Sequence, residues 1–433
     1  MNDHQLFSLE EIVAHARTHS PYYRQLYLDI PQSGWKLCDL PIIDSADFWR
    51  ANVTKGDNTV VTDFGSGGIV FKSGGTTGVP KHSVFGRNEW ATMCHALGIH
   101  MQYAGLQDGD RAANLFYGGS LYASFLFVYH ALMDAPVKAV QYPLSGGADP
   151  ELMIETIREF DINVLLGVPT TLLQLIDHIE QQEIEGIHLE RLFYAGETMY
   201  PDQRQRIEQC FPGIRIASCG LASVDAGFLA YADMECGFNE HRIMDSHTCI
   251  EIVDEQTGEP ILEQDRQGLI VATNLTRKRM PIIRYPIGDY GMWREPEHAA
   301  NRKFVLLGRS EAGARVGPAT VYVSDIARIL ESFAQEVRVD NFQLIIRHDH
   351  GLDRLTLRLC VPYLPHDGEQ LGRLIIKKLL KEREMLAQLF EDGLINPLQV
   401  EWADDSQLII NPRTGKCLRV VDQRIQPGGD THP

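Results

Sequence analysis

A segment rich in glycine and hydroxyl residues ends in a lysine and has the composition of an anion site. It runs from Ser73 to Lys81 and reads Ser-Gly-Gly-Thr-Thr-Gly-Val-Pro-Lys. Glycines let backbone N–H groups approach an anion closely, the hydroxyls add donors, and Lys81 adds a cation. The segment differs from the Walker pattern G-x-x-x-x-G-K-[ST], because its lysine follows a proline and no hydroxyl residue follows directly. It predicts a triphosphate-binding loop of another kind, and a flexible surface loop is the alternative.

Four further segments place charged side chains next to glycine. They are Tyr194–Glu197 (YAGE), Arg284–Asp289 (RYPIGD), Gly308–Glu311 (GRSE) and Asn411–Asp422 (NPRTGKCLRVVD). The carboxylate of Asp289 suits two vicinal hydroxyl donors. Lys416, in the last of these segments, supplies a cation. Taken singly, Tyr194–Glu197 and Arg284–Asp289 can also be turns, Gly308–Glu311 an exposed ion pair, and Lys416 a solvated surface lysine.

In this order, the segments resemble motifs of the adenylate-forming superfamily of acyl-CoA synthetases, peptide-synthetase adenylation domains and luciferases. In detail they are similar to its phenylacetate-CoA ligase-like branch. His19–Arg24 is similar to the "PFYR" element near the start of that branch, and Leu40–Ile43 resembles its next element. Separate elements spread over about 400 residues seldom keep one order by chance. The resemblance therefore covers nearly the whole chain.

The resemblance implies an ATP-dependent ligase that converts a carboxylic acid to an acyl-adenylate, releases pyrophosphate and passes the acyl group to a thiol. It implies catalytic roles for Lys416 and Lys81. ATP and Mg²⁺ would be the cofactors, and CoA or a phosphopantetheinyl acyl or aryl carrier protein would be the acceptor. The nucleotide would bind at Ser73, Gly74, Gly75, Thr76, Thr77, Gly78, Gly196, Glu197, Asp289 and Arg309.

One stretch departs from the family, in which "YGxTE" supplies a tyrosine that stacks on adenine and a glutamate that holds Mg²⁺. This chain reads Ser218–Gly227 as SCGLASVDAG. In one register Ser223 replaces the carboxylate, and in the other Asp225 supplies it. We expect Asp225 to be the metal ligand, because carboxylate oxygens suit the hard Mg²⁺ ion. Both registers lack the aromatic stack.

The sequence is compatible with three other functions. The departures at Ser218–Gly227 and, after Glu311, at Ala312–Pro318 permit a catalytically impaired homologue that only binds a nucleotide or an acyl group. An adenylation-only enzyme that passes the acyl group to a partner protein is the second. A P-loop-like phosphotransferase is the third, and the proline before Lys81 disfavours it.

The resemblance places the acid beside Asn114–Tyr122, with Phe116, Tyr117, Ser120, Ser218 and Gly220 as substrate-binding residues. Aromatic walls and glycines there would fit an aromatic or medium acyl acid. For Phe116 and Tyr117 a place in the core is equally expected. For Phe125 and Phe127 the core is the expectation.

Two clusters have both a binding and a structural interpretation. Cys236, His241, His247 and Cys249 fall within 14 residues and offer mixed Zn²⁺ ligands. Their spacing matches no standard finger, and His247–Cys249 can equally begin a strand that continues to Val253. The second cluster is a set of five cations on a predicted helix. It could receive a CoA phosphate or an acidic carrier protein, or it could be a solvated helix face. Its members are Arg373, Lys377, Lys378, Lys381 and Arg383.

The elements that must position these residues alternate in type. Apolar runs at 163–168 and 191–196 predict buried strands, and residues at three and four spacing predict helices over 150–159 and 170–181. This pattern predicts a layered α/β domain, residues 1–308, with a mostly parallel sheet and the ATP and acid sites. The later part of the chain has strand-like patterns at 342–347 and 355–360 and a helical stretch at 369–390. This pattern predicts a smaller, mobile α+β domain, residues 309–433, which carries Lys416.

The bulk composition agrees with a globular enzyme. The chain has 433 residues, of which 44% are hydrophobic, and a net charge of −18, which argues against nucleic acid as a partner. No segment has the pattern of a signal peptide, and the most apolar stretch, 121–132, is too short to span a membrane. Eight dispersed cysteines fit reduced thiols, so we expect a cytoplasmic protein.

Overall fold

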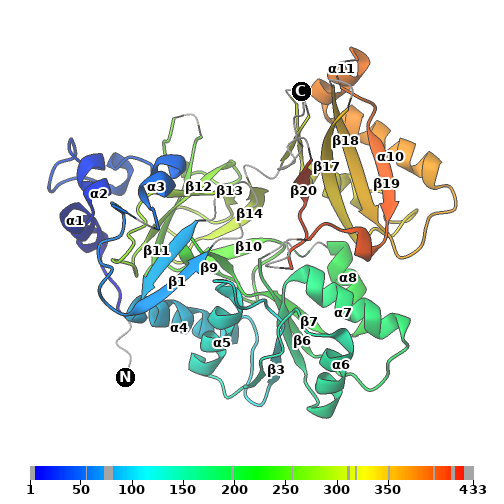
Figure 1. The fold of residues 1–433 in the computed structure, drawn as a ribbon, viewed down its shortest axis with the longest axis horizontal. Helices are drawn as coiled ribbons and strands as arrows, with labels where there is room; N and C mark the ends of the chain where they lie inside the picture. Colours follow the sequence, from blue (N-terminus) through cyan, green and yellow to red (C-terminus); the bar gives the residue numbers. More distant parts are fainter. Residues whose placement is uncertain are drawn as a thin grey trace. The chain divides into compact units, whose positions relative to one another are not determined.

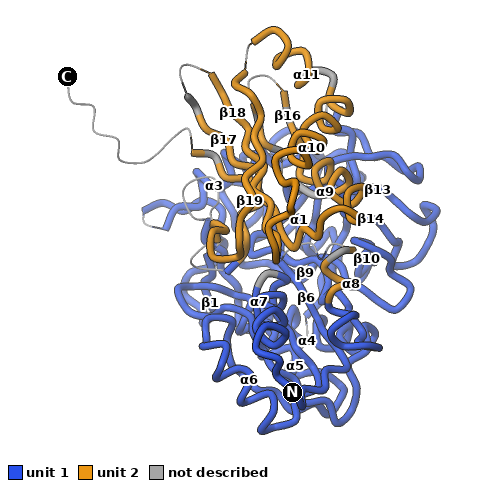
Figure 2. The backbone as a smooth tube through the Cα atoms, turned by 90° about the vertical axis from the view of Figure 1, so that its right-hand side faces the viewer, with its two compact units in different colours: residues 1–199, 207–307, 412–415 blue, residues 200–206, 308–411, 416–433 orange. Residues whose placement is uncertain are grey.

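The chain divides into two compact units, which are described separately (Figure 2). Unit 1 comprises residues 1–199, 207–307 and 412–415, and unit 2 comprises residues 200–206, 308–411 and 416–433. The structure is a computed structural model. It describes residues 5–54, 56–72, 81–196, 199, 201–255, 257–309, 313–316, 319–349, 352–393, 395–410 and 415–423.

A five-stranded sheet in unit 1 is wholly parallel, as the alternating sequence pattern predicts. Its order is β4 (Val140–Tyr142), β3 (Arg111–Asn114), β5 (Val164–Gly167), β6 (Arg191–Tyr194) and β7 (Arg215–Ser218). The connecting helices are α5 (Ser124–Asp134), α6 (Pro150–Glu159), α7 (Pro169–Gln181) and α8 (Pro201–Cys210) (Figure 1). Apolar side chains of α6 and α7 pack on β5 and β6, so the two predicted helices and the two predicted strands are confirmed.

A seven-stranded sheet forms the other half of unit 1 and was not predicted as a whole. Its order is β11 (Thr248–Val253), β12 (Gly268–Asn274), β13 (Tyr285–Trp293), β14 (Lys303–Arg309), β10 (Glu240–Ile243), β9 (Gly227–Tyr231) and β8 (Leu221–Ser223). Strand β11 confirms the strand interpretation of the residues up to Val253. The core between this sheet and the first helices contains residues of α1 (Leu9–His19), α2 (Pro21–Leu26) and α3 (Ser45–Ala51).

A two-stranded hairpin flanks the predicted phosphate loop. Strand β1 (Gly68–Lys72) pairs antiparallel with β2 (His82–Gly86), and Lys72 faces His82 at the end where the loop connects them. Helix α4 (Arg87–Tyr103) follows directly, with its Trp90 packed on Phe71 and Phe85 of the hairpin. The hairpin is thereby anchored in the hydrophobic core, which fixes both ends of the loop.

Unit 2 is an α+β unit, as predicted. Its four-stranded sheet has the order β19 (Gln399–Ala403), β18 (Leu352–Cys360), β17 (Asn341–Asp349) and β20 (Val420–Asp422). Helices α9 (Val323–Glu331), α10 (Gly368–Glu382) and α11 (Glu384–Glu391) contribute apolar side chains to its core, which is shared with the sheet. The remaining elements are the hairpin of β15 (Gly313–Val316) and β16 (Ala319–Tyr322) and the short helices η1 (Leu37–Asp39, in unit 1) and η2 (Asp405–Gln407).

The single helical stretch predicted over 369–390 is wrong in one respect, because it consists of two helices. The break lies at Arg383, whose backbone is at φ −127° and ψ 82°. The Arg383 guanidinium binds the carboxylate of Asp325 and lies 5.1 Å from the centre of the Tyr322 ring. This tertiary contact overrides the continuous helical periodicity. None of the helices in the described part of the chain is long and apolar enough to cross a membrane.

Candidate functional site

Lys81, the last residue of the predicted loop, belongs to a hydrogen-bonded cluster in unit 1. Its Nζ lies 3.2 Å from Oδ2 of Asp225 and 3.4 Å from the hydroxyl of Tyr285. Tyr285 donates to the same Oδ2 over 2.9 Å and accepts from Nε1 of Trp49, also over 2.9 Å. The Oγ of Ser45 is 3.4 Å from the Tyr285 hydroxyl. The cluster therefore joins α3, the start of β2, the β8–β9 turn and β13.

Asp225 has one satisfied and one unsatisfied carboxylate oxygen. Oδ2 accepts from Tyr285 and Lys81, whereas Oδ1 is buried and has no hydrogen-bond partner among the residues that the structure describes. The backbone carbonyl of Asp225 accepts a 2.6 Å hydrogen bond from Nη1 of Arg277, a fully buried residue whose guanidinium lies 3.9 Å from the centre of the Phe85 ring. A buried, unpaired carboxylate oxygen is costly unless a cation binds it, so Oδ1 fits a Mg²⁺ ligand.

The protonation states follow from burial and charge. Burial by itself lowers the pKa of Lys81, but the Asp225 carboxylate and the Tyr285 hydroxyl outweigh it, so the pKa lies above its usual value. Burial, followed by the Asp225 carboxylate, raises the pKa of Tyr285. Lys81 is therefore an ammonium and Tyr285 a neutral phenol at neutral pH. The cluster offers a cation, a hydrogen-bond donor and a free carboxylate oxygen.

Ser218 and Gly220 lie together at the carboxyl end of β7. The Oγ of Ser218 accepts from the backbone N–H of Gly220 over 3.0 Å and is 3.4 Å from Nε2 of His241. Gly220 has φ +114°, and a Cβ there would collide with the carbonyl oxygen of Ala230, so this turn requires glycine. Burial lowers the pKa of His241 to about 4. The imidazole is therefore neutral near pH 7.

The predicted acid-binding segment is divided between core and surface. Phe116 is 2% exposed within a hydrophobic core cluster, which favours the core alternative for this residue. Tyr117 is half-buried, and its hydroxyl is 3.5 Å from Oγ1 of Thr171. Ser120 is exposed at φ 48°, in a left-handed turn that continues through Leu121 at φ 67°. Phe127 is core, as expected, and Phe125 is half-buried against the same core.

The other predicted nucleotide-binding residues are distributed over several elements. Gly196 is exposed at φ 86° after β6, half-buried Asp289 lies on β13, and Arg309 ends β14. Lys416 is half-buried and follows Gly415, where a Cβ would collide with the ring of Tyr117. Outside the described residues lie Ser73, Gly74, Gly75, Thr76, Thr77, Gly78 and Glu197. Among the described site residues that the sequence predicts, Lys81 contacts Asp225, and Ser218 contacts Gly220.

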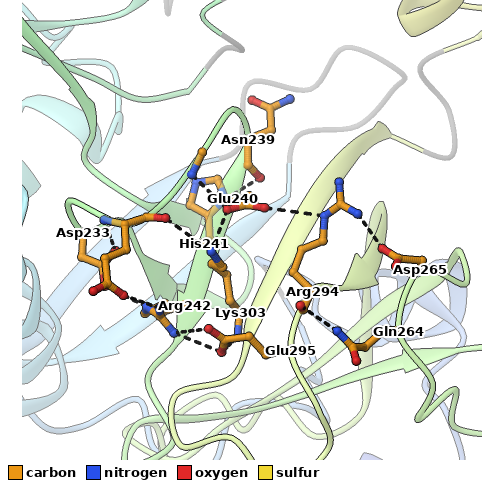
Figure 3. A network of polar contacts seen from close by, with 12 residues as sticks. Asp233, Asn239, Glu240, His241, Arg242, Gln264, Asp265, Arg294, Glu295 and Lys303 are labelled. Atoms are coloured by element: carbon orange, nitrogen blue, oxygen red, sulfur yellow. Dashed lines mark hydrogen bonds and ion pairs between the residues drawn. The ribbon is translucent and has the colours of Figure 1, made fainter.

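The four cysteines and histidines considered for zinc have separate partners, and the backbone N–H of Cys236 donates to the carbonyl of Asp233 over 3.3 Å. His241 lies with Nδ1 3.2 Å from the carbonyl oxygen of Asn239, in the polar network drawn in Figure 3. His247 contacts Ser246, and Cys249 pairs with Thr273 between β11 and β12. Over the described ranges, no three His, Cys, Asp or Glu side chains are grouped so as to hold a metal ion. We therefore do not propose zinc at these positions.

The network around His241 consists of ion pairs between strands. Arg242 binds the carboxylates of Asp233 and Glu295 at 2.7 and 2.9 Å (Figure 3). Glu240 binds Lys303 at 3.0 Å and Arg294 at 3.5 Å. These pairs connect β10 with β14 and with the segments that follow β9 and β13. The network accounts for the charged residues of this region as sheet-stabilising contacts.

The basic residues of α10 are mostly engaged within unit 2 or exposed. Arg373 pairs with Glu369 one turn earlier, and Lys378 donates to the hydroxyl of Ser332. Arg383 binds Asp325, while Lys377 and Lys381 are exposed. This arrangement favours the solvated helix face over a binding stripe.

Sequence reasoning missed Trp49, Arg277 and Tyr285 as members of the site. Tyr285 lies inside the segment Arg284–Asp289, but the family motif that this segment resembles gives a binding role only to the aspartate. Trp49 and Arg277 have no motif, and an apolar-face tryptophan is expected in the core. Only the convergence of α3, β13 and the β8–β9 turn reveals their role.

Comparisons with known proteins agree with the fold and the motifs. Residues 69–274 match the family described as AMP-binding enzyme. A phenylacetate-coenzyme A ligase of Thermus thermophilus is 25% identical over 442 residues, covering 96% of this chain and 95% of that protein. A phenylacetate-coenzyme A ligase of Pseudomonas putida is 27% identical over 300 residues, which cover 67% of this chain and 66% of that protein. A crystal structure of 2-hydroxyisobutyryl-CoA ligase in the postadenylation state has a TM-score of 0.73 at 19% identity, covering 96% of this chain and 88% of that one.

Proposed function

We propose that this chain, which belongs to the adenylate-forming superfamily and to its phenylacetate-CoA ligase-like branch, activates an aromatic or medium acyl acid with ATP. It is an AMP-forming acid–thiol ligase. The acid carboxylate attacks the α-phosphorus of ATP and pyrophosphate leaves. The thiol of CoA then attacks the acyl carbonyl of the adenylate, loses its proton, and AMP leaves. The observation that carries the assignment is the Lys81–Asp225–Tyr285 cluster, which places an ammonium and a free carboxylate oxygen at the end of the predicted phosphate loop.

The nucleotide site would comprise the loop, the residues that follow β6, Asp289 within β13, and Arg309 at the end of β14. Loop residues Ser73–Gly78 would cradle the phosphates, and the Lys81 ammonium would stabilise their charge. Asp289 would accept from the ribose hydroxyls, with Gly196, Glu197 and Arg309 beside the nucleotide. When bound to Oδ1 of Asp225, Mg²⁺ would neutralise charge on the phosphates. Lys416 would supply a second ammonium during adenylation.

The acid would bind near Tyr117, Ser120, Ser218 and Gly220, with Phe116 as the core wall behind them. The half-buried ring of Tyr117 supplies an apolar face. The Ser218 hydroxyl, held by Gly220 and His241, supplies a polar contact. A pocket with one apolar wall and few polar groups suits an aromatic or medium acyl chain.

We propose the cytoplasm as the location of the protein, supported by eight cysteines that are all free.

The function is tested by ATP–pyrophosphate exchange across a panel of aromatic, aliphatic and amino acids. We expect exchange with at least one aromatic or medium acyl acid, and loss of exchange in Lys416→Ala. Nucleotide binding without exchange for any acid would instead establish a binding homologue and contradict the ligase assignment. Release of phosphate in place of pyrophosphate would contradict it as well.

The acceptor is tested with the acid found in this way. Thiol consumption is followed with CoA, and acyl loading with holo-carrier proteins. We expect turnover with CoA. Loading of a carrier protein without turnover of CoA would assign adenylation-only chemistry with delivery to a partner.

A further inference from the structure

We propose that Tyr285 is a positioning residue that, held by Trp49, fixes the Asp225 carboxylate so that its Oδ1 alone faces a divalent cation. The inference deepens the proposed function and rests on it, because the cation is the one that accompanies ATP. Neither Tyr285 nor Trp49 would contact the nucleotide or the reacting atoms in this role.

The directions of the hydrogen bonds are fixed by the chemistry of the four groups. The indole N–H of Trp49 and the ammonium of Lys81 can only donate, and an ionised carboxylate can only accept. Trp49 and Lys81 therefore use the two lone pairs of the Tyr285 oxygen, at 2.9 and 3.4 Å. The single phenolic proton is left for Oδ2 of Asp225, at 2.9 Å. The Oγ of Ser45 is a further neighbour of this hydroxyl at 3.4 Å, but Oδ2 is the nearer acceptor for the phenolic proton.

The Tyr285 ring cannot move its hydroxyl away from Asp225. The residue is 1% exposed, and its ring is 5.7 Å from the Phe48 ring and 6.3 Å from the Trp49 ring, measured between centroids. Phe48 and Trp49 are neighbours on α3, so one short helix holds both the ring and the hydroxyl. A phenol with two side-chain torsions that is packed in this way loses little further freedom when it positions a carboxylate.

Asp225 is held at its backbone as well as at Oδ2. Its carbonyl accepts from Nη1 of Arg277, which is itself fully buried and stacked on Phe85. With the main chain and Oδ2 both fixed, the position of Oδ1 is determined. Oδ1 is buried and accepts from no donor among the described residues, so a cation there displaces none of the hydrogen bonds that they make. Partners of a ligating carboxylate commonly govern metal affinity in this way.

The test measures cation affinity directly. The probe is MnCl₂, titrated into the full-length protein with α,β-methylene-ATP present and followed by the electron paramagnetic resonance of free Mn²⁺. Tyr285→Phe removes the hydroxyl and keeps the ring, and we expect it to weaken Mn²⁺ binding about 10-fold or more. Trp49→Phe removes the N–H that orients the hydroxyl, together with one ring of the indole that packs near Tyr285 and Lys81, and we expect a smaller loss in the same direction. Asp225→Asn sets the scale for loss of the ligand.

Two control variants make the same chemical deletion elsewhere. Tyr23→Phe removes a buried hydroxyl that donates to the carbonyl of Pro281 over 2.8 Å. Trp293→Phe removes an indole N–H that donates to the carbonyl of Ile261 over 2.8 Å. Both should bind Mn²⁺ as the wild type does. Wild-type affinity in Tyr285→Phe, or equal weakening in Tyr285→Phe and Tyr23→Phe, would overturn the positioning role.

A kinetic measurement separates positioning from general damage. The Mg²⁺ concentration for half-maximal exchange should rise in Tyr285→Phe, while the rate at saturating Mg²⁺ stays within about threefold of wild type. A fall in the saturating rate with an unchanged Mg²⁺ requirement would contradict the proposal. If the wild type exchanged with no acid, the ligase function would fail, and the Mn²⁺ comparison would still decide the role of Tyr285.

Discussion

At the scale of single residues, the site depends on pairs of opposite charge that are only partly removed from water. The Lys81 side chain is 37% exposed and that of Asp225 15% exposed, so the ammonium is accessible to solvent and, in the function we propose, to a phosphate. A lysine at this position is a movable point charge, which suits phosphate groups that change their charge during reaction. The ion pair with Asp225 holds the Lys81 ammonium at the end of the loop, and the Asp225 carboxylate compensates the charge of that ammonium.

Replacement of Lys81 by methionine should lower kcat/KM for ATP about 100-fold or more, because the phosphates lose their cation. Steady-state exchange kinetics with varied ATP check this result. The matched control is Lys303→Met, which also breaks a lysine–carboxylate pair, at 3.0 Å from Glu240, but away from the cluster. We expect near-wild-type kinetics for the control. Similar losses in both variants would contradict a specific role for Lys81.

His241 makes the stability of the fold depend on pH. Its folded-state pKa is about 4, below the ordinary value of 6.5, because it is buried. Between these values the unfolded chain binds more protons, so stability contributed by His241 is present above pH 6.5 and is lost as the pH falls toward 4. The loss is at most about 1.4 kcal/mol per pH unit.

The measurement is urea unfolding of wild type and His241→Gln at several pH values between 4.5 and 7.5. The difference in unfolding free energy between the two proteins should shrink as the pH falls. A constant difference over this range would show that His241 is charged in the folded protein or accessible to water.

At the scale of elements, the start of β13 is held by one buried arginine. Arg284 binds Glu251 of β11 through two hydrogen bonds of 2.9 and 3.0 Å. It also donates to the carbonyls of Cys38 and Leu40, and its own backbone is at φ 48°. This arginine, directly before Tyr285, therefore joins the start of β13 to β11, to η1 and to the residue that follows η1. The sequence motif that suggested nucleotide binding thus also contains a structural residue.

Replacement of Arg284 by methionine should destabilise the protein by roughly 3–5 kcal/mol, because the Glu251 carboxylate stays buried without its partner. Adding Glu251→Gln should recover part of that loss. Urea unfolding of the single and double variants checks both statements. Arg50→Met, which breaks an exposed pair with Asp47, should cost no more than about 1 kcal/mol. A loss for Arg284→Met no larger than that of Arg50→Met would contradict the expectation.

At the scale of the whole molecule, the two compact units divide the predicted catalytic groups. The Lys81–Asp225 cluster belongs to unit 1, whereas Lys416 belongs to unit 2. We propose that the small domain, residues 309–433, moves between the two half-reactions, as the two-domain organisation of the superfamily implies. We therefore expect Lys416 to serve the first half-reaction and not the second.

Lys416→Ala should abolish exchange, with a loss of about 100-fold or more, and leave thiol transfer from a preformed acyl-adenylate within a few-fold of wild type. The two half-reactions are measured separately, with exchange for the first and thioester formation from synthetic acyl-adenylate for the second. Lys138→Ala, on the exposed surface of unit 1, is the control. Equal losses in both half-reactions would contradict the assignment of Lys416 to adenylation.

The sequence by itself determined the family, the parallel α/β layer and the chemistry expected at Lys81 and Asp225. Those features depend on local order: helix and strand periodicity at 150–181, and glycine, lysine and carboxylate in fixed succession. Only the tertiary structure decided that α10 and α11 separate at Arg383, that Phe116 is core, and that Trp49 and Tyr285 hold Asp225. These outcomes depend on contacts between residues far apart in the chain, to which local periodicity is insensitive.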